Sequence, residues 1–259
     1  MTREWNAALY EDLSSPMTRW GAEFLGRVKL AGDEDVMDAG CGTGKVTALL
    51  LERLPRGTVL AVDGSRAMVE AAAGRFAGDG RVRVERQDLL ELKVEEPLDL
   101  VFSTATFHWI NDHERLFERI SEALKPGGRL AAQCGGEGNI SRATRATKRV
   151  MEWERFRPFY EGWDDGKTYA GVEETEGRLE AAGFESVEVW LHEEPTRFGS
   201  VGELARYLGT IVLGAHLDRL PEEKREEFVG AVAGEIVFEH KDPLLDYVRL
   251  NMMATRSDA

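Results

Sequence analysis

Short apolar runs and amphipathic stretches alternate over the first half of the chain. The apolar runs predict β-strands at Val36–Ala39, Thr58–Asp63, Val82–Glu85, Leu98–Ser103 and Arg129–Cys134. Between them, the helical spacing of apolar residues predicts helices at Lys45–Leu54, Ser65–Phe76 and Asp112–Leu124. Strands and helices in this alternation are typical of a parallel sheet covered by helices on both faces.

The alternation breaks after Cys134, where residues 135–138 (GGEG) predict a loop. The later pattern predicts helices at Ser141–Phe156, Val172–Ala182, Val201–His216 and Pro221–Val237, and strands at Val187–Leu191 and Leu245–Ala254. We therefore expect a single α/β domain over residues 1–259, built on a doubly wound, seven-stranded, mostly parallel sheet. Segments 137–170 and 199–243 are expected to be helical insertions between the late strands.

Composition and charge exclude several classes of protein. With 42% hydrophobic and 31% charged residues, the 259-residue chain has the composition of a globular protein rather than a disordered one. Its 33 Lys and Arg against 47 Asp and Glu give a net charge of −14, which disfavours nucleic acid and anionic membrane surfaces as partners. No apolar run approaches the roughly 20 residues that a membrane helix requires.

The cysteines and the N-terminus bear on where the protein works. Cys41 and Cys134 match neither the spacing of a zinc site nor a disulfide framework. Residues 1–15 contain no apolar core of a secretory signal. We therefore expect a protein of the reducing cytoplasm that holds no metal.

The stretch from Val36 to Lys45 (VMDAGCGTGK) predicts a strand, a glycine-rich turn and the start of a helix. A dinucleotide-binding G-x-G-x-x-G motif would require glycine at position 45, and a phosphate-binding loop would require Ser or Thr where Val46 stands. What remains is Asp38 followed by glycines at positions 40, 42 and 44. This spacing resembles the first motif of the class I S-adenosylmethionine-dependent methyltransferases.

The resemblance implies a Rossmann-like methyltransferase fold that binds S-adenosylmethionine and releases S-adenosylhomocysteine. Glycines allow positive φ angles and a close approach of a ligand to the backbone. A carboxylate beside the turn attracts the ammonium and sulfonium groups of this cofactor. The cofactor-binding residues expected in the turn are Asp38, Gly40, Cys41, Gly42 and Gly44.

Asp63 and Gly64 follow the second apolar run, and Asp63 stands 25 residues after Asp38. This separation is near the ~20-residue offset at which an acidic residue of a βαβ unit reaches a ribose. A carboxylate accepts hydrogen bonds from both ribose hydroxyls; a helix cap is the alternative role, which Ser65 fills as well. Met68 resembles the family's apolar contact to adenine, and a place in the core is its alternative.

The ends of the next two strands supply further candidates. Asp88 is placed to accept a hydrogen bond from the adenine amine, with Gln87 and Leu89 beside it, unless it is an ordinary turn residue. The fourth strand supplies three candidates at its end, Ser103, Thr104 and Ala105. We expect them beside the methyl donor, because ligands of open α/β sheets bind at the carboxyl ends of the strands.

Within this class the chain most resembles the trans-aconitate 2-methyltransferases. The segment with Trp5 and Tyr10 is similar to the part of that family that closes over the cofactor, and the late helices are similar to its helical cap. The segment Phe107, His108, Trp109 is similar to the family's segment after the fourth strand, where Gln often replaces His108. The resemblance implies methylation of a small-molecule carboxylate, with Trp5, Phe107 and Trp109 around it; packing against the next helix is the alternative for the aromatic residues of this segment.

A carboxylate acceptor needs little acid–base help, because it is already ionised near pH 7. Its other carboxylates need cations, and Arg145 and Arg149 share one helical face in a basic stretch. A solvated face paired with acidic neighbours is the alternative. His108 is the candidate catalytic residue: it would act as a base for a hydroxyl or amine acceptor. For a carboxylate we expect it to donate a hydrogen bond or to pack.

Other functions stay open at this point. The same fold and cofactor would serve a hydroxyl, amine or carbon acceptor, or a cofactor-binding protein without catalysis. A nucleic-acid methyltransferase is disfavoured by the net charge and by the segment after the fourth strand, which lacks an Asn/Asp-Pro-Pro-aromatic motif. A nicotinamide-dependent dehydrogenase is disfavoured by Lys45. The acceptor and the oligomeric state are left open.

Overall fold

The structure is a computed structural model that describes residues 15–258. Trp5 and Tyr10, two of the expected site residues, lie outside the described residues. The chain divides into two compact units. Within the described residues, unit 1 comprises residues 15–136, 168–191 and 250–258, and unit 2 comprises residues 137–167 and 192–249. That the inserted segments act as a cap on one domain stays a prediction.

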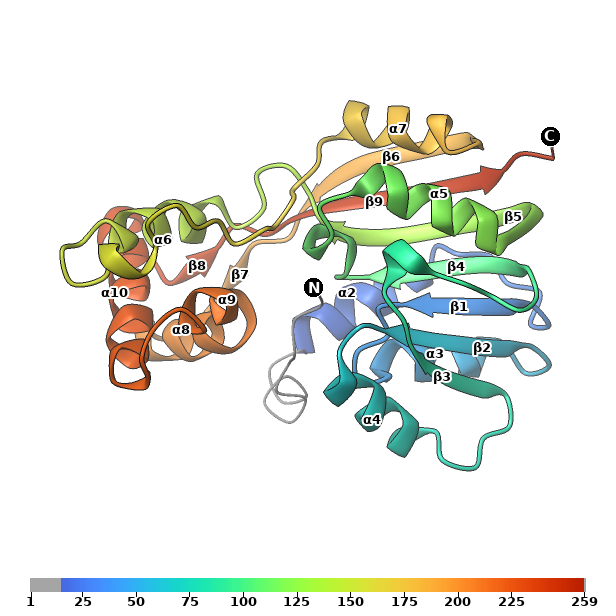
Figure 1. The fold of residues 1–259 in the computed structure, drawn as a ribbon, viewed down its shortest axis with the longest axis horizontal. Helices are drawn as coiled ribbons and strands as arrows, with labels where there is room; N and C mark the ends of the chain where they lie inside the picture. The colour runs from blue at the N-terminus through green and yellow to red at the C-terminus, as the bar shows by residue number, and fades with distance from the viewer. Residues whose placement is uncertain (1–14, 259) are drawn as a thin grey trace. The chain divides into compact units, whose positions relative to one another are not determined.

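A seven-stranded sheet forms the centre of unit 1, which confirms the expected fold class. Its strands are β1 (Asp35–Ala39), β2 (Thr58–Asp63), β3 (Val82–Arg86), β4 (Leu98–Thr104), β5 (Leu124–Gly135), β6 (Phe184–Glu193) and β9 (Val248–Arg256). They lie in the order β3-β2-β1-β4-β5-β9-β6. The pairs from β3 to β5 are parallel, whereas the arrow of β9 points opposite to that of β4 (Figure 1).

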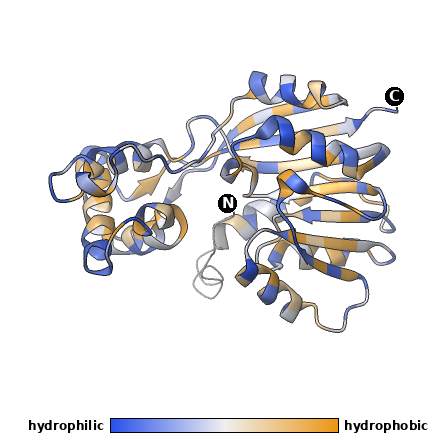
Figure 2. Ribbon diagram, in the orientation of Figure 1, coloured by the Kyte–Doolittle hydropathy of each residue, from blue (hydrophilic) through white to orange (hydrophobic). Residues whose placement is uncertain are grey.

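Helices cover both faces of this sheet (Figure 1). The helices on one face are α5 (His113–Ala123) and α7 (Val172–Ala181), and those on the other are α2 (Ser15–Leu25), α3 (Lys45–Arg53) and α4 (Arg66–Arg75). The interiors of β1, β2 and β4 are buried on both faces, and Figure 2 shows these strands mostly in the colour of hydrophobic residues. Because both faces are covered, their sequences are continuous apolar runs rather than alternating ones.

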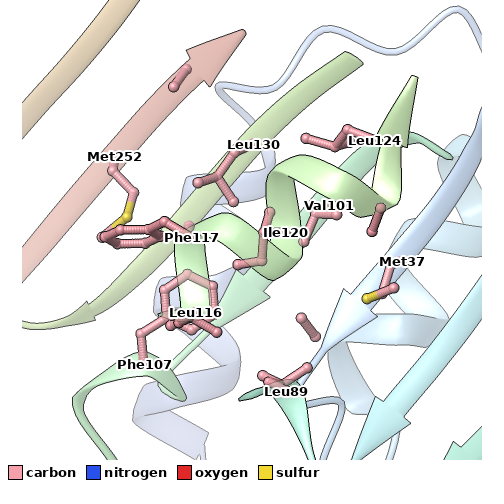
Figure 3. Packing of buried hydrophobic residues seen from close by; sticks show 14 of the residues in the cluster. Met37, Leu89, Val101, Phe107, Leu116, Phe117, Ile120, Leu124, Leu130 and Met252 are labelled. Carbon is pink, nitrogen blue, oxygen red and sulfur yellow. The ribbon is translucent and has the colours of Figure 1, made fainter. Parts of the chain in front are cut away.

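The core beneath α5 anchors the end of β4. Phe117 of α5 lies beside Met252 of β9 (Figure 3). Phe107, the first residue of the short 3₁₀-helix η2 (Phe107–Trp109), meets Phe117 edge to face with ring centroids 6.1 Å apart. The chain that leaves β4 is therefore fixed to the core within three residues of the strand's end.

Unit 2 consists mainly of helices. Its elements are α6 (Ser141–Met151), the 3₁₀-helix η3 (Arg157–Phe159), β7 (Thr196–Arg197), α8 (Val201–Tyr207), the π-helix η4 (Leu208–Val212), α9 (Gly214–Leu217), α10 (Glu222–His240) and β8 (Leu244–Leu245). Aromatic rings fill its centre, where Phe228 meets Phe156 edge to face with centroids 5.1 Å apart. None of the helices in residues 15–258 is long and apolar enough to cross a membrane.

Two late elements and one early helix differ from the sequence-based expectation. The single helix expected at Val201–His216 is wrong, because the π-helix interrupts it; there Leu213 N–H donates to Leu208 C=O, five residues back. The strand expected at Leu245–Ala254 is divided into β8 and β9. Helix α2 was not expected at all, although Ser15-Pro16 at its start is a common helix-start signal.

A carboxylate from the end of unit 2 holds the start of α6. Asp246 accepts hydrogen bonds from the Ser141 hydroxyl (2.5 Å) and from Arg142 N–H (3.1 Å). The residue before the helix, Ile140, has φ 45° and ψ 38°, a left-handed conformation that is strained for a β-branched side chain. Its own N–H donates to Asp246 C=O at 2.9 Å. Asp246 thus supplies the cap that Ile140 does not.

We predict that Asp246→Ala lowers the free energy of unfolding by about 1–2 kcal/mol, because the first turn of α6 loses its anionic cap. Asp246→Asn retains an acceptor oxygen and should lose less. Denaturant unfolding followed by limited proteolysis between residues 137 and 167 measures both effects. Exposed Glu161→Ala, in the same unit, is the control; equal stability of all four proteins would contradict the capping role.

Candidate functional site

The turn between β1 and α3 contains three glycines with positive φ angles, 83° at Gly40, 55° at Gly42 and 83° at Gly44. Their surroundings differ. A Cβ at position 40 would lie 2.0 Å from Thr106 Oγ1, and one at position 44 would lie 2.6 Å from the Phe76 ring. A Cβ at position 42 would meet no protein atom within 4 Å. Two of the glycines are thus required by packing, whereas Gly42 faces open space.

That open space is a cleft in unit 1, which encloses about 360 Å³ including its part open to solvent. The cleft is lined by Met17, Thr18, Gly40, Cys41, Gly42, Thr43, Lys45, Val46, Thr104 and Ala105. The structure therefore brings together five expected residues from the ends of β1 and β4. Met17, Thr18, Thr43, Lys45 and Val46 were not expected there.

Asp63, at the end of β2, joins two strand-to-helix turns. Its Oδ2 accepts a hydrogen bond from Gly42 N–H (3.0 Å), and its Oδ1 accepts one from Ser65 N–H (2.8 Å). Ser65 itself caps α4, since its hydroxyl accepts from Met68 N–H. The capping role considered for Asp63 thus belongs to Ser65. A carboxylate offers about four acceptor sites, so these two bonds are compatible with further bonds from a ligand.

Asp38 is buried at the end of β1, with 1% of its surface exposed. Its Oδ2 accepts a hydrogen bond from the Thr47 hydroxyl of α3 at 2.6 Å. Burial raises the pKa of Asp38 to about 7; the Thr47 hydrogen bond lowers this pKa and the negative charge of Asp63 raises it. Asp38 does not line the cleft. Its hydrogen bond with Thr47 instead connects the start of the glycine turn to α3.

The candidates after β3 and β2 are partly engaged within the protein. The Gln87 side chain bonds to the backbone of Lys93, donating at 3.1 Å and accepting at 3.0 Å. Exposed Asp88 caps the 3₁₀-helix η1 (Leu89–Glu91) by accepting from Leu90 N–H. Leu89 is buried in the core beneath α5. Two more candidates lie near the start of α4: Met68 is buried, and Gly64 C=O accepts from Arg86.

The end of β4 is tied to the glycine turn by two hydroxyl groups. Ser103 is buried, and its hydroxyl donates to Ala39 C=O at 2.7 Å. The Thr106 hydroxyl lies 3.3 Å from Gly40 C=O and 3.1 Å from Thr104 C=O. Between them Ala105 has φ 59°, a conformation that side chains rarely adopt. Thr106 was not expected in the site; a hydroxyl two residues past a strand end is a weak signal in sequence.

The aromatic turn after β4 is more buried than a pocket wall would be. Phe107 is a core residue and Trp109 is half-buried. His108 is 8% exposed, and its Nδ1 accepts a hydrogen bond from Gly135 N–H at 3.3 Å. Its ring stacks on Tyr169, with centroids 5.9 Å apart. In the neutral ring the proton is then on Nε2, because Nδ1 is the acceptor.

Arg145 and Arg149 lie on α6 of unit 2, where both are paired with acidic side chains of α10. Arg149 contacts Glu235 (3.1 Å) and Glu239, and Arg145 lies 4.0 Å from Glu239. The side chains of both arginines are at least two-fifths exposed. These are the contacts of a solvated basic face, and binding of an acceptor by either arginine stays a prediction.

Comparison with known proteins identifies the family. The sequence profile described as a methyltransferase domain matches residues 36–128. The chain is 32% identical to the trans-aconitate 2-methyltransferase of Methylobacterium nodulans, over 98% of this chain and 99% of that protein. It is also 32% identical to the enzyme of that name from Escherichia coli, over 87% of this chain and 86% of that protein.

The chain belongs to the class I S-adenosylmethionine-dependent methyltransferases. The fold of the chain agrees with this family assignment. A solved structure of a phosphoethanolamine N-methyltransferase from Haemonchus contortus, in complex with S-adenosylhomocysteine, superposes with a TM-score of 0.62. That alignment covers 97% of this chain and 57% of the other at 21% identity, so it supports the fold alone.

The glycine turn fits the cofactor of this family. At Gly42 the backbone borders the cleft with no side chain in between, a surface that a Cβ would fill. The carboxylate of Asp63 provides negative charge near this turn, which suits a ligand with ammonium and sulfonium groups, and such a cation would favour the ionised form of Asp38, whose pKa burial raises to about 7. Among residues 15–258, no group of three His, Cys, Asp or Glu side chains is arranged to hold a metal ion.

Substitution of the glycines should separate packing from ligand binding. Gly42→Ala adds a methyl group to the cleft, and we expect S-adenosylmethionine affinity to fall at least tenfold by calorimetry. Its stability should fall by about 1–2 kcal/mol because φ is positive. Gly40→Ala should destabilise more, since Thr106 must move.

The matched control is Gly74→Ala in α4, where a Cβ meets no atom within 4 Å and φ is not positive. We expect this variant to be about 0.5–1 kcal/mol more stable and to bind the cofactor normally. Normal affinity in Gly42→Ala would contradict a cofactor site at this turn.

The buried carboxylate predicts a pH dependence of stability. Because the pKa of Asp38 is raised from 3.8 to about 7, the folded state binds more protons than the unfolded state between these values. Stability from this group therefore declines as pH rises from about 4 to 7. Asp38→Asn removes the effect, so its free energy of unfolding relative to wild type should rise by roughly 2–4 kcal/mol from pH 4 to pH 8.

Denaturant unfolding across this pH range measures that difference. Thr47→Val is the companion variant: it removes the hydrogen bond that lowers the pKa of Asp38, so the decline should extend to higher pH. If the free energy of unfolding changed with pH equally in wild type and Asp38→Asn, the pKa of Asp38 would not be raised in the folded protein, and the prediction would be wrong.

Proposed function

We propose that this methyltransferase transfers a methyl group to a carboxylate of trans-aconitate or a closely related small acid. The observation that carries the proposal is the similarity to trans-aconitate 2-methyltransferases along nearly the whole chain, which includes the regions outside the shared cofactor-binding half. The acceptor is a small molecule, and the cytoplasm is the proposed location.

The cofactor lies, in this proposal, along the carboxyl ends of β1, β2 and β4. Asp63 binds the ribose hydroxyls, the turn from Gly40 to Gly44 lies under the cofactor, and Asp38 stabilises its cationic end. Lys45, which lines the cleft at the start of α3, is placed near the cofactor's own carboxylate. S-adenosylmethionine supplies an electrophilic methyl group, and the protein's contribution is to bind, orient and exclude water.

The hydrogen bond that His108 Nδ1 accepts supports a carboxylate acceptor. With Nδ1 accepting from Gly135 N–H, the neutral ring presents Nε2–H, which is a donor and not a base. A hydrogen-bond donor suits a methyl acceptor that is already an anion, because the donor orients the carboxylate without removing a proton. A hydroxyl or amine acceptor would instead require His108 to give up the Gly135 hydrogen bond.

The alternatives are separable by assay. Methyl transfer to a different small molecule, and cofactor binding without catalysis, are both compatible with an intact cofactor site. Purified protein is incubated with S-adenosylmethionine and a panel of trans-aconitate, other tricarboxylates, and hydroxyl and amine compounds. We expect S-adenosylhomocysteine and a monomethyl ester with trans-aconitate. Turnover of a hydroxyl or amine compound alone would reject the carboxylate assignment.

His108→Gln provides a sharper test, because Gln keeps an N–H donor and lacks a basic nitrogen. We predict that this variant retains carboxylate methylation within about tenfold, whereas His108→Leu loses more than tenfold. The rate should show the same pH dependence between pH 6 and 8 in wild type and in His108→Gln, as expected for an acceptor that is already ionised. Complete loss in His108→Gln with an intact fold would indicate a catalytic base.

A further inference from the structure

The turn after β4 is fastened to helix α5 through Phe107. The carbonyl oxygen of Phe107 accepts a hydrogen bond from Ile110 N–H at 2.9 Å and lies 3.0 Å from His113 Nε2. The ring of Phe117, one helical turn along α5, packs against both His113 and Phe107, with centroids 5.8 Å and 6.1 Å away. Both the backbone and the side chain of Phe107 are thus held by one helix.

The surroundings of His113 determine which ring nitrogen carries its proton. Arg178 of α7 approaches Nδ1 with its Nη1 at 3.5 Å, and arginine has donors only, so Nδ1 must accept. The neutral ring therefore carries its proton on Nε2, which donates to Phe107 C=O. His113 is 3% exposed, and Arg178 is itself paired with Glu174 at 2.8 Å.

His108, the next residue of the turn, is also bound by the segment that leads into α7. Its carbonyl oxygen accepts a hydrogen bond from Thr168 N–H at 3.0 Å, and its ring stacks on Tyr169. Thr168 and Tyr169 precede α7, the helix that presents Arg178 to His113. The contacts at Phe107 therefore reach α5, and those at His108 reach the segment that leads into α7.

We propose that His113 is a positioning residue for methyl transfer, which holds the turn bearing His108 in place through the carbonyl oxygen of Phe107. The inference rests on the proposed function in one respect, that His108 faces the acceptor. Loss of the Nε2–H donor leaves Phe107 C=O with one partner and allows the turn to shift. A displacement of about 1 Å in such a group lowers a rate by up to about 100-fold.

Charged groups around His113 make this arrangement sensitive to acid. Burial and the positive charge of Arg178 lower the pKa of His113, whereas the Phe107 hydrogen bond and the negative charges of Glu174 and Asp112 raise it; the net direction is down. Protonation at Nδ1 would give His113 a positive charge and an N–H donor that face the positive charge and the N–H donor of Arg178. The imidazolium would still donate from Nε2 to Phe107 C=O, so displacement of the turn at acid pH comes from repulsion between the ring and Arg178.

The first test replaces the imidazole. His113→Leu removes the donor, and we expect kcat to fall about 10- to 100-fold while the KM for S-adenosylmethionine changes less than threefold. His113→Gln retains an N–H at the position of Nε2 and should recover most of the lost rate. Its activity should also fall less at acid pH. Exposed His192→Gln, remote in sequence and outside the turn, is the control.

The second test changes the charges and leaves His113 in place. Arg178→Gln removes the charge that repels the imidazolium, so the loss of rate at acid pH should become smaller. Glu174→Gln removes a negative charge that raises the pKa of His113, so the acid limb of the pH–rate profile should move to lower pH. A role in folding alone would produce neither change. An acid limb that is unchanged in both variants, or equal loss in His113→Leu and His113→Gln when both are folded, would overturn the proposal.

A third measurement needs no acceptor and therefore separates this inference from the proposed function. In the ¹⁵N spectrum of the cofactor-free protein, assigned by the His113→Gln variant, we expect His113 as the Nε2–H tautomer. His113→Leu should shift the imidazole resonances of His108. The Nδ1–H tautomer, or unchanged His108 resonances, would refute the positioning role even if trans-aconitate is methylated.

Discussion

The carboxylate of Asp63 is the contact on which the geometry of the cofactor site depends. It receives the N–H of Gly42 on one oxygen and the N–H of Ser65 on the other, so it joins the turn after β1 to the turn after β2. Adjacent parallel strands bring the two turns to one edge of the sheet, and the carboxylate then fixes their distance. A backbone held in this way can face a ligand without side chains to support it.

Two carboxylates near one turn also define the charge of the ligand that fits there. Asp38 is buried beside α3, and the charge of Asp63 makes its ionisation harder. A cation at the turn relieves this repulsion, whereas a pyrophosphate would increase it. Similar glycine-rich turns bind dinucleotides in other proteins. In this protein the turn suits a sulfonium nucleoside, because the acidic residues make the electrostatic potential at the turn negative.

The acceptor side of the site depends on helices rather than on the sheet edge. Segment 104–109 leaves β4, contacts the glycine turn through Thr106, enters the core at Phe107 and is held by His113. These contacts come from the glycine turn and from α5, and His108 itself is bound by Thr168 and Tyr169 before α7. The position of His108 therefore depends on how these elements pack as much as on its own sequence. A shared fold can therefore support different acceptors when these helices change.

The fold class, the cofactor and the glycine turn were predictable from the amino-acid pattern alone, because burial on both faces produces apolar runs and because glycine spacing depends on local backbone geometry. Two local contacts had to be seen in the structure: Ser65, and not Asp63, caps α4, and His113 lies against Phe107 C=O. The folded structure was also needed to show that Phe107 belongs to the core, that Arg145 and Arg149 pair with α10, and that Thr106 contacts the glycine turn. The pairing with α10 and the contact of Thr106 join residues far apart in the chain, and such contacts leave no periodic signal in sequence.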